Sequence, residues 1–189
     1  MKNVLIISSD LYKQKSTDFL IKGYIDGLLE VGVPYRILYI ADLFFNPNRR
    51  LPSKEIKPLE SDLLRSLKLI HWSTHIVVFC PVYTSFIPSK IRTFFDILFN
   101  SNQLQFDPNR IDTNYFGKSA RIVNILDKEL LDVYNTTKST NFMSIRRETF
   151  ERCSVRPVRT STVGRLYELH NPYSQKWYHK MKQFGIKTM

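Results

Sequence analysis

The chain is poor in glycine, cysteine and histidine, and this excludes several classes of site. Its 189 residues include only six glycines, two cysteines and four histidines. No Gly-x-Gly-x-x-Gly dinucleotide fingerprint occurs, and Gly117-Lys118-Ser119 lacks the upstream glycine of a P-loop. The histidines are scattered, with no cysteine or carboxylate set to hold zinc, so we expect no metal site. No Gly-x-Ser-x-Gly elbow marks a serine hydrolase.

Long apolar runs are missing too. No run approaches the roughly 18 residues that would suggest a membrane span. The apolar run Val4–Ile7 is too short for the core of a signal peptide. Cys80 falls at the end of a predicted buried strand, and Cys153 would need a base partner to act as a nucleophile. We therefore expect a cytoplasmic protein without membrane insertion, built as one domain over residues 1–189.

Positive charge is in excess. The formal net charge is +11, and the segment from Ile145 to the C-terminus contains ten Lys or Arg against three Glu. Such an excess favours anionic partners, for example a nucleotide or a phosphate-bearing cofactor. The cations are dispersed and no recognisable nucleic-acid-binding module accompanies them, so nucleic acid is not the expected partner. A solvated basic face would explain the same residues.

Compact apolar runs alternate with helical patterns along the chain. Strands are predicted at Asn3–Ser8, Pro34–Ile40, Ile76–Cys80, Ala120–Leu126 and Val155–Ser161. Helices are predicted from Ser16 or Thr17 to Gly32 and over 58–72, 87–99, 142–153 and 172–184. Such alternation indicates an α/β fold with a doubly wound parallel sheet. The segment Asp127–Asn141 shows no clean periodicity and is interpreted as an irregular loop facing a ligand.

The stretch Ile76–Phe99 organises this prediction. Its first five residues are apolar, as in a strand buried on both faces. Pro81 cannot donate to a sheet, so the strand is expected to end there. Pro88 suits the first turn of the helix that follows. In an open α/β sheet, ligands bind in the crevice beyond the carboxyl end of such a strand.

The first strand–helix junction is the natural place for an anion. N–H groups at the start of a helix carry partial positive charge and lack partners within the helix. Ser16 and Thr17 could add hydroxyl donors, and Lys13 and Lys15 could add charge. The alternative interpretation is that Ser16 or Thr17 only caps the helix.

The order of the motifs resembles a known family. The motifs are, in order, Val4–Ser8, Ser16-Thr17, Pro81–Pro88, Phe94-Phe95-Asp96, Gly117–Ala120 and Arg156–Gly164, so they span nearly the whole chain. In this order the chain is similar to the flavodoxin-like NAD(P)H:quinone oxidoreductases, the group of the drug-activity modulators and the potassium-efflux ancillary subunits. It implies a flavodoxin-like five-stranded parallel sheet of order 2-1-3-4-5, with helices on both faces.

The resemblance also implies cofactors and partners. FMN, or FAD, would bind at the carboxyl ends of the strands in a homodimer, and hydride would pass from NAD(P)H through the flavin to a quinone or similar small-molecule acceptor. By position, Tyr134 matches a tyrosine that polarises the substrate in relatives, and is the expected catalytic residue. The phosphate would lie on the loop ending at Ser16 and Thr17, and the flavin ring against residues 81–85. The expected cofactor-binding residues are Asp10, Lys15, Ser16, Thr17, Pro81, Val82, Tyr83, Thr84, Ser85, Phe86, Leu126 and Asp127.

Several positions depart from the family pattern. Thr84 and Ser85 stand where relatives usually carry aromatic residues, and residues 126–129 replace a Thr-Thr-Gly-Gly loop whose glycines let the backbone approach the flavin. Asp10 begins the pair that replaces a His-Pro, and an anion there opposes a phosphate. Thr140 falls near the place of the relatives' catalytic histidine. The alternative function is therefore a flavodoxin-fold protein with a degenerate flavin site, acting as a binding or regulatory subunit.

Overall fold

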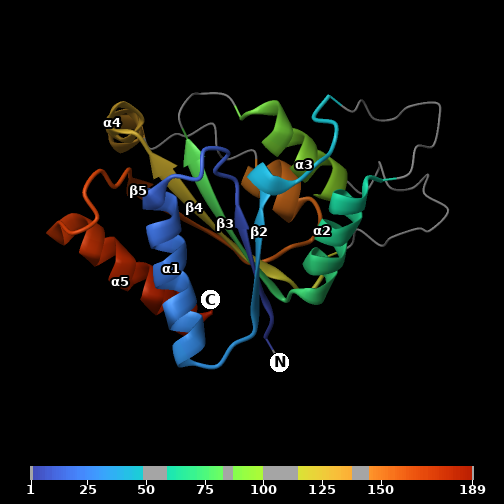
Figure 1. Ribbon diagram of the computed structural model, residues 1–189, viewed down its shortest axis with the longest axis horizontal. Coiled ribbons are helices and arrows are strands. Elements are labelled where there is room, and N and C mark those ends of the chain that lie inside the picture. Colours follow the sequence, from blue (N-terminus) through green and yellow to red (C-terminus); the bar gives the residue numbers. More distant parts are fainter. Residues whose placement is uncertain (1, 49–58, 83–86, 100–114, 138–144, 189) are drawn as a thin grey trace.

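Five parallel strands form one sheet at the centre of the structure (Figure 1). The computed structural model describes residues 2–48, 59–82, 87–99, 115–137 and 145–188. The strands are β1 (Val4–Ser8), β2 (Tyr35–Tyr39), β3 (His75–Val82), β4 (Ser119–Leu126) and β5 (Val158–Gly164). They lie in the order β2-β1-β3-β4-β5, and every neighbouring pair is parallel. The predicted flavodoxin-like sheet and its strand order are confirmed.

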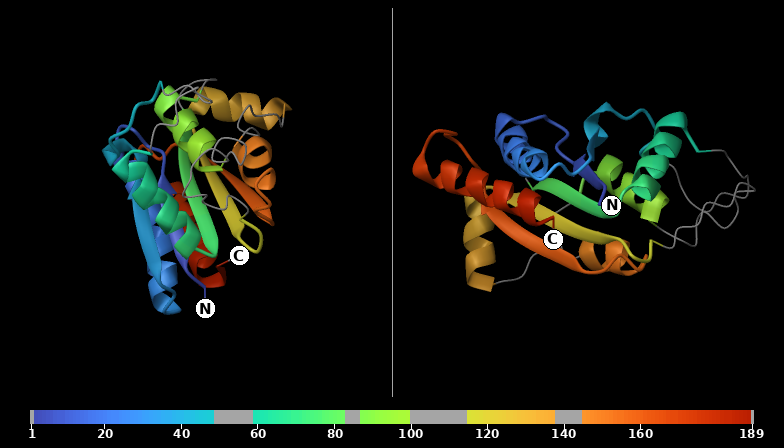
Figure 2. Two further views of the ribbon diagram at one scale, coloured as in Figure 1. Left: turned by 90° about the vertical axis from the view of Figure 1, so that its right-hand side faces the viewer. Right: turned by 90° about the horizontal axis from the view of Figure 1, so that it is seen from below.

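Helices cover both faces of this sheet (Figures 1 and 2). The five α-helices are α1 (Lys15–Glu30), α2 (Ser61–Trp72), α3 (Ser89–Phe99), α4 (Lys128–Thr137) and α5 (Pro172–Lys187). Two shorter elements are a 3₁₀ turn, η1 (Ile40–Asp42), and a π-helical segment, η2 (Ile145–Glu151). Helices α1 and α5 pack on one face, while α2, α3 and η2 pack on the other. Helix α4 lies beyond the carboxyl ends of β4 and β5 (Figure 1).

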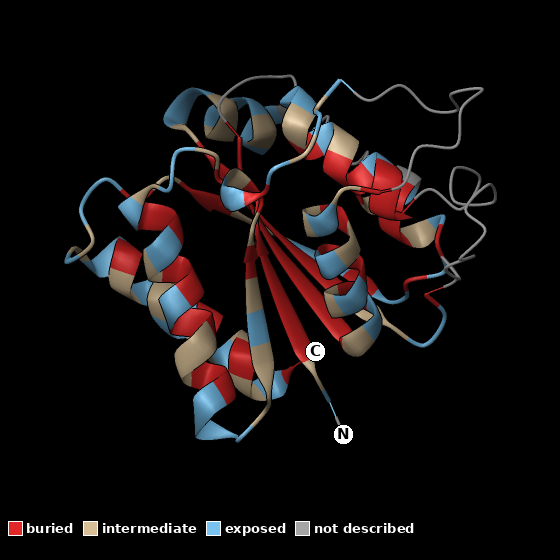
Figure 3. Ribbon diagram, turned by 45° about the vertical axis from the view of Figure 1, so that its right-hand side comes forward, coloured by how far each residue is buried: buried red, intermediate tan, exposed pale blue. Residues whose placement is uncertain are grey.

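Each face of the sheet has its own apolar core. Alternate side chains of a strand point to opposite faces, so Leu5 and Ile7 join the core under α2 and α3, while Val4 and Ile6 join the core under α1 and α5. Because both faces are covered, every residue of β1 and β3 is buried, as Figure 3 shows for the centre of the sheet. Each large apolar side chain buried in this way contributes about 1.5–3 kcal/mol.

Two glycines let α1 and α5 approach backbone to backbone. A Cβ atom on Gly27 would lie 2.1 Å from the carbonyl oxygen of Lys182, and one on Gly185 would lie 2.2 Å from the carbonyl oxygen of Tyr24. No real side chain tolerates such distances, so these positions fix the separation of the two helices. Tight packing of this kind makes the α1–α5 layer a rigid support for the start of α1.

Strand β3 continues through Pro81 to Val82, so the prediction that it ends before Pro81 is wrong. The carbonyl of Phe79 accepts a hydrogen bond from the N–H of Ser9, so the backbone of Phe79 faces β1. Residues two apart in a strand present their backbones to the same side, so the nitrogen of Pro81 also faces β1. Strand β1 has already ended at Ser8. The missing N–H therefore costs no sheet hydrogen bond, while β3 keeps its pairing with β4 up to Val82.

The segment after β4 is a helix, whereas the sequence analysis predicted an irregular loop over 127–141. Helix α4 begins at Lys128, and residues 138–141 lie outside the described part of the chain. Leu130, Leu131 and Tyr134 pack against the core under α2 and α3. Their i, i+1, i+4 spacing is helical, but the apolar stripe is too short to stand out in a polar segment.

Other predicted elements keep their type with shifted bounds. Strand β5 begins at Val158 and not at Val155, directly after Pro157, which has no N–H to donate. The helix predicted over 142–153 is helical from Ile145 to Glu151, and residues 142–144 are outside the described ranges. Pro88 directly precedes α3 and accepts the N–H of Arg92 through its carbonyl, as expected for a proline at a helix start.

Candidate functional site

The carboxyl ends of β1, β3 and β4 meet at one edge of the sheet, because the strands are parallel neighbours. Three junctions lie at this carboxyl edge: the β1–α1 loop over 9–14, the segment after Val82, and the β4–α4 junction at Asp127. An open α/β sheet binds ligands at this edge, next to the point where the strand order reverses. The predicted site residues Tyr83, Thr84, Ser85 and Phe86 fall in the second junction and lie outside the described residues.

Asp10 is the most firmly bound polar residue of the β1–α1 loop. It is 1% exposed, directly after β1. Its Oδ1 accepts the N–H of Tyr12 at 3.0 Å, and its Oδ2 accepts the N–H of Gln14 at 2.9 Å and the hydroxyl of Thr17 at 2.6 Å. Gln14 is the N-cap residue of α1, and its side chain makes no capping bond. The carboxylate thus lies at the start of α1, where the helix dipole favours negative charge.

The other predicted residues of this loop lie around that carboxylate. Lys13 has a left-handed backbone (φ 49°), and its ammonium is 2.5 Å from Oδ1 of Asp42 and 5.9 Å from the centre of the Tyr39 ring. Lys15 is exposed, and Ser16 is buried in the first turn of α1. The Lys13 cation is therefore held by η1, while Lys15 and Ser16 remain close to the helix start.

The β4–α4 junction holds an ion pair. Asp127 Oδ1 accepts a hydrogen bond of 3.0 Å from the guanidinium of Arg165, and both side chains are about one-third exposed. The N–H of Arg165 donates to the carbonyl of Leu126 at 2.7 Å. The side chain of Leu126 is 0% exposed and belongs to the core, so it offers no contact surface to a ligand. The sequence analysis did not single out Arg165, because its proximity to Asp127 depends on the pairing of β4 with β5.

The remaining predicted residues have largely structural surroundings. Pro81 and Val82 are buried at the end of β3. Tyr134 is half-buried on α4 and packs against the core under α2 and α3. These positions lie along the same edge as Asp10 and Asp127, and their roles toward a ligand stay predictions.

A row of small polar side chains crosses the sheet just below the carboxyl edge. Cys80 is in register with Asn124, and Asn124 with Thr162, while Ser9 follows β1 beside Cys80. Asn124 is 5% exposed, and its Oδ1 has no hydrogen-bond partner within the described part of the chain. Burial raises the pKa of the Cys80 thiol, against a smaller opposite effect of its hydrogen bond with Ser9. Cys80 is therefore a neutral thiol rather than a thiolate nucleophile.

Two residues that the sequence left open have structural roles. The thiol of Cys153 is buried and donates to the carbonyl of Phe99. The ammonium of Lys118 donates to the carbonyls of His71 (3.0 Å) and Ser73, at the end of α2. Burial lowers the pKa of Lys118. Lys118 precedes β4 and so lies at the amino edge of the sheet, which agrees with the interpretation of Gly117-Lys118-Ser119 as a chance match.

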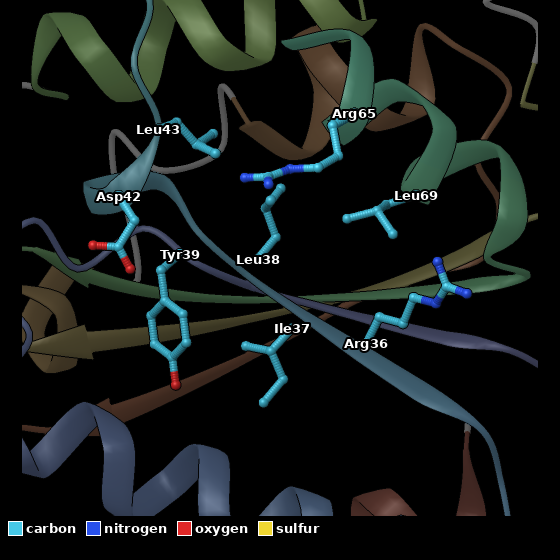
Figure 4. A pocket seen from close by; sticks show the side chains of 8 residues that line it. All are labelled: Arg36, Ile37, Leu38, Tyr39, Asp42, Leu43, Arg65 and Leu69. Carbon is cyan, nitrogen blue, oxygen red and sulfur yellow. The ribbon is translucent and has the colours of Figure 1, made fainter. Parts of the chain in front are cut away.

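An open pocket of about 500 Å³ lies beside the edge strand β2 (Figure 4). The guanidinium of Arg36 lies 4.7 Å from the centre of the Trp72 ring, and that of Arg65 is 3.5 Å from the carboxylate of Asp62. Sequence analysis did not predict this pocket, because strands and helices that are distant in the chain build it. Its lining residues are Arg36, Ile37, Leu38, Tyr39, Asp42, Leu43, Arg65 and Leu69.

Two classes of feature are not found in the described part of the chain. No group of three or more His, Cys, Asp or Glu side chains there could hold a metal ion. None of the described helices is both long enough and apolar enough to cross a membrane.

Several solved structures share this fold, and two of those described below are named as an oxidoreductase and an azoreductase. The chain superposes on Smu.1420 from Streptococcus mutans with a TM-score of 0.76 and 16% identity, over 98% of this chain and 99% of that one. For the NAD(P)H:quinone oxidoreductase from Methanothermobacter marburgensis the TM-score is 0.72 and the identity 15%, over 98% and 95%. For the FMN-dependent NADH-azoreductase from Bacillus anthracis, in complex with FMN, the values are 0.64 and 11%, over 100% and 99%. At these identities the likeness shows the fold.

The sequence itself matches one family. No curated protein sequence matches the chain. A sequence model of the family described as NADPH-dependent FMN reductase matches residues 2–139, which contain all three junctions of the carboxyl edge. The family description names FMN and NADPH, in agreement with the predicted FMN cofactor and NAD(P)H co-substrate. The chain therefore belongs to the NADPH-dependent FMN reductase family.

Proposed function

We propose that the chain is a flavin-dependent NAD(P)H oxidoreductase that passes electrons to a quinone or a similar small-molecule acceptor. The observation that carries this proposal is the family match over residues 2–139. The acceptor is suggested by the names of fold neighbours, which include an NAD(P)H:quinone oxidoreductase and an azoreductase.

The described residues fit the ring of FMN better than they fit the phosphate of FMN. At the carboxyl edge the residue Val82 is buried, and just below it the acceptor Asn124 Oδ1 is buried without a partner within the described residues. A buried acceptor of this kind favours a ligand with N–H donors, such as a flavin ring, at this edge. The start of α1, in contrast, already holds the carboxylate of Asp10.

A bound flavin would supply the redox chemistry, namely acceptance of a hydride from NAD(P)H and two-electron reduction of the acceptor, which takes up protons. The protein binds and orients. Arg165, held by Asp127, presents a guanidinium at the carboxyl edge, suited to the phosphates of NAD(P)H or to an anionic acceptor. Tyr134 is proposed to donate a hydrogen bond to the acceptor, in accordance with the resemblance.

The assembly and the subtype belong to the same proposal. A homodimer follows from the resemblance to the drug-activity modulators and potassium-efflux ancillary subunits, while the cytoplasm and a single domain over residues 1–189 are proposed from the sequence composition and length. Sedimentation of the purified chain at twice its 22.4 kDa mass would support the dimer, and a monomer would contradict it.

A second candidate function is a binding or regulatory subunit without catalysis. Two observations favour it: the carboxylate of Asp10 at the predicted phosphate position, and the charged Asp127–Arg165 pair at the junction where relatives carry glycines.

Visible absorbance of the purified chain separates the two functions. A yellow protein, or one that binds FMN or FAD with micromolar affinity and is bleached by NAD(P)H, supports the oxidoreductase. A colourless protein that binds neither flavin contradicts it and favours the regulatory subunit. Steady-state rates with NADH and NADPH, measured with a water-soluble quinone, then define the reductant.

A further inference from the structure

We infer that Asp10 determines the flavin specificity of this chain: its carboxylate fills the anion-binding position at the start of α1, so the chain binds flavins without recognising a phosphate there. The inference rests on the proposed function, because it presumes that a flavin binds at the carboxyl edge. It replaces the expectation that the phosphate lies against Thr17.

The donors that a phosphate would use are already engaged. The N–H groups of Tyr12 and Gln14 and the hydroxyl of Thr17 all donate to Asp10, at 2.6–3.0 Å. These are charge-assisted bonds, which are shorter and stronger than bonds between neutral groups. A phosphate could use them only by displacing a carboxylate that is 1% exposed.

The donors that remain are few. The N–H groups of Lys15 and Ser16, in the first turn of α1, have no partner within the helix. A phosphate bound to them alone would lie next to the negative charge of Asp10, and at such short range the repulsion is substantial. The ammonium of Lys13 opposes this charge only in part, because it also pairs with Asp42, and Lys15 is exposed at the same helix start.

The loop conformation holds the carboxylate in place. The bond from the N–H of Tyr12 to Asp10, two residues earlier, is the pattern of an Asx turn. It leads the chain into the left-handed backbone of Lys13 (φ 49°), which is uncommon for a residue other than glycine. The charge of Asp10 also acts on helix α1. The pKa of Asp18 is raised, mainly by burial and to a smaller extent by the charge of Asp10. The loop is thus built around an internal anion.

A measurable consequence follows for ligand choice. FMN and riboflavin share the ring and differ by the phosphate, so a chain that does not recognise the phosphate binds both with similar affinity. We expect the dissociation constants of the two flavins, from quenching of flavin fluorescence, to agree within about threefold for the natural chain.

Two variants separate the charge of Asp10 from its shape. Asp10→Asn keeps the shape and removes the charge, while Asp10→Ala also empties the position. We expect FMN affinity to rise roughly tenfold or more over that of riboflavin in Asp10→Ala, and by less in Asp10→Asn. Asp18→Asn is the matched control: it removes the same charge from an exposed position in the first turn of α1 and should leave the ratio unchanged. Thermal melts establish that each variant is folded.

The outcomes distinguish this inference from the proposed function. A natural chain that binds FMN about tenfold more tightly than riboflavin, or a ratio that neither Asp10 variant changes, would overturn the inference and leave the oxidoreductase intact. If the ratio of FMN to riboflavin affinity shifted equally in Asp18→Asn, the effect would come from the overall charge of the protein and not from Asp10, and the inference would also be overturned. If neither the natural chain nor either Asp10 variant bound a flavin, the proposed function and the inference would fail together. A ratio of FMN to riboflavin affinity that is near one in the natural chain and rises only in the Asp10 variants would support the inference.

Discussion

The two ends of the sheet use polar residues in different ways. At the amino edge, Lys118 joins β4 to the end of α2, and Nδ1 of His75 lies 2.8 Å from the hydroxyl of Ser119 on the neighbouring strand. At the carboxyl edge, Asp10 binds groups of its own loop, and Asn124 Oδ1 has no partner among the described residues. At the amino edge these bonds join separate elements, whereas Asp10 at the carboxyl edge satisfies donors of its own loop and of the first turn of α1.

This difference assigns stability to one part of the molecule and binding to the other. Substitutions in the α1–α5 layer and at the amino edge should change the free energy of unfolding and leave flavin affinity unchanged. Substitution of Asp10 should change the flavin preference, in addition to the loss of stability that follows from removing three charge-assisted hydrogen bonds. The following predictions test this division.

The largest effect is expected for Gly27→Ala in the α1–α5 layer. The new Cβ would lie 2.1 Å from the carbonyl oxygen of Lys182 and 2.9 Å from the nitrogen of Ile186. The two helices must separate, so we expect a loss of about 3 kcal/mol or more in the free energy of unfolding by urea titration. Lys22→Ala, exposed on the same helix, should change it by less than about 0.5 kcal/mol. Equal urea midpoints for the two variants would show that the close contact at Gly27 does not determine the stability of the α1–α5 layer.

A pH effect of similar size is expected from His75 at the amino edge. His75 is 2% exposed; burial, followed by the charges of Arg121, Lys2 and Arg159, lowers its pKa to about 4. The unfolded chain binds the proton at a higher pH, near 6.5, so the free energy of unfolding falls as the pH decreases from about 6.5 to about 4. The full loss is on the order of 3 kcal/mol.

Comparison with His75→Gln isolates this effect from other titrating groups. The variant should lose less stability than the natural chain between pH 7 and pH 4.5 in urea titrations, while His170→Gln, at an exposed position, should follow the natural chain. An identical pH dependence in all three proteins would mean that His75 does not titrate differently on folding.

Much of the fold could be predicted from the sequence. The features that could not be predicted share one cause, which is that they depend on neighbours distant in the chain. The buried strands and the helical stripes follow from periodicity, and the strand order follows from the resemblance. The continuation of β3 through Pro81 could not be predicted, because it depends on where β1 ends beside it. The role of Gly27 is equally hidden, since a glycine in a helix does not reveal which backbone lies against it.

The sequence predicted that the candidate site lies at the carboxyl edge of the sheet, but it did not predict the hydrogen bonds within the site. The sequence places Asp10, Asp127 and Val82 at the ends of three strands, and the parallel sheet brings those ends together. The sequence also shows that Asp10 is an unfavourable neighbour for a phosphate. It does not show that the carboxylate of Asp10 accepts hydrogen bonds from N–H groups of its own loop, because those bonds depend on the turn that leads to α1.

The smallest effect is expected for Lys118→Met, which tests the amino edge directly. The variant removes the donor to the carbonyls of His71 and Ser73 while it keeps most of the aliphatic stem. The end of α2 is then less stable, and the free energy of unfolding should fall by about 1 kcal/mol. Flavin affinity should stay unchanged, because Lys118 lies at the opposite edge from the crevice. Lys68→Met, exposed on α2, is the control for removal of a positive charge and should alter neither quantity. A loss of FMN affinity in Lys118→Met alone would place a phosphate at Gly117-Lys118-Ser119, so that the amino edge would bind the ligand and the carboxyl edge would not.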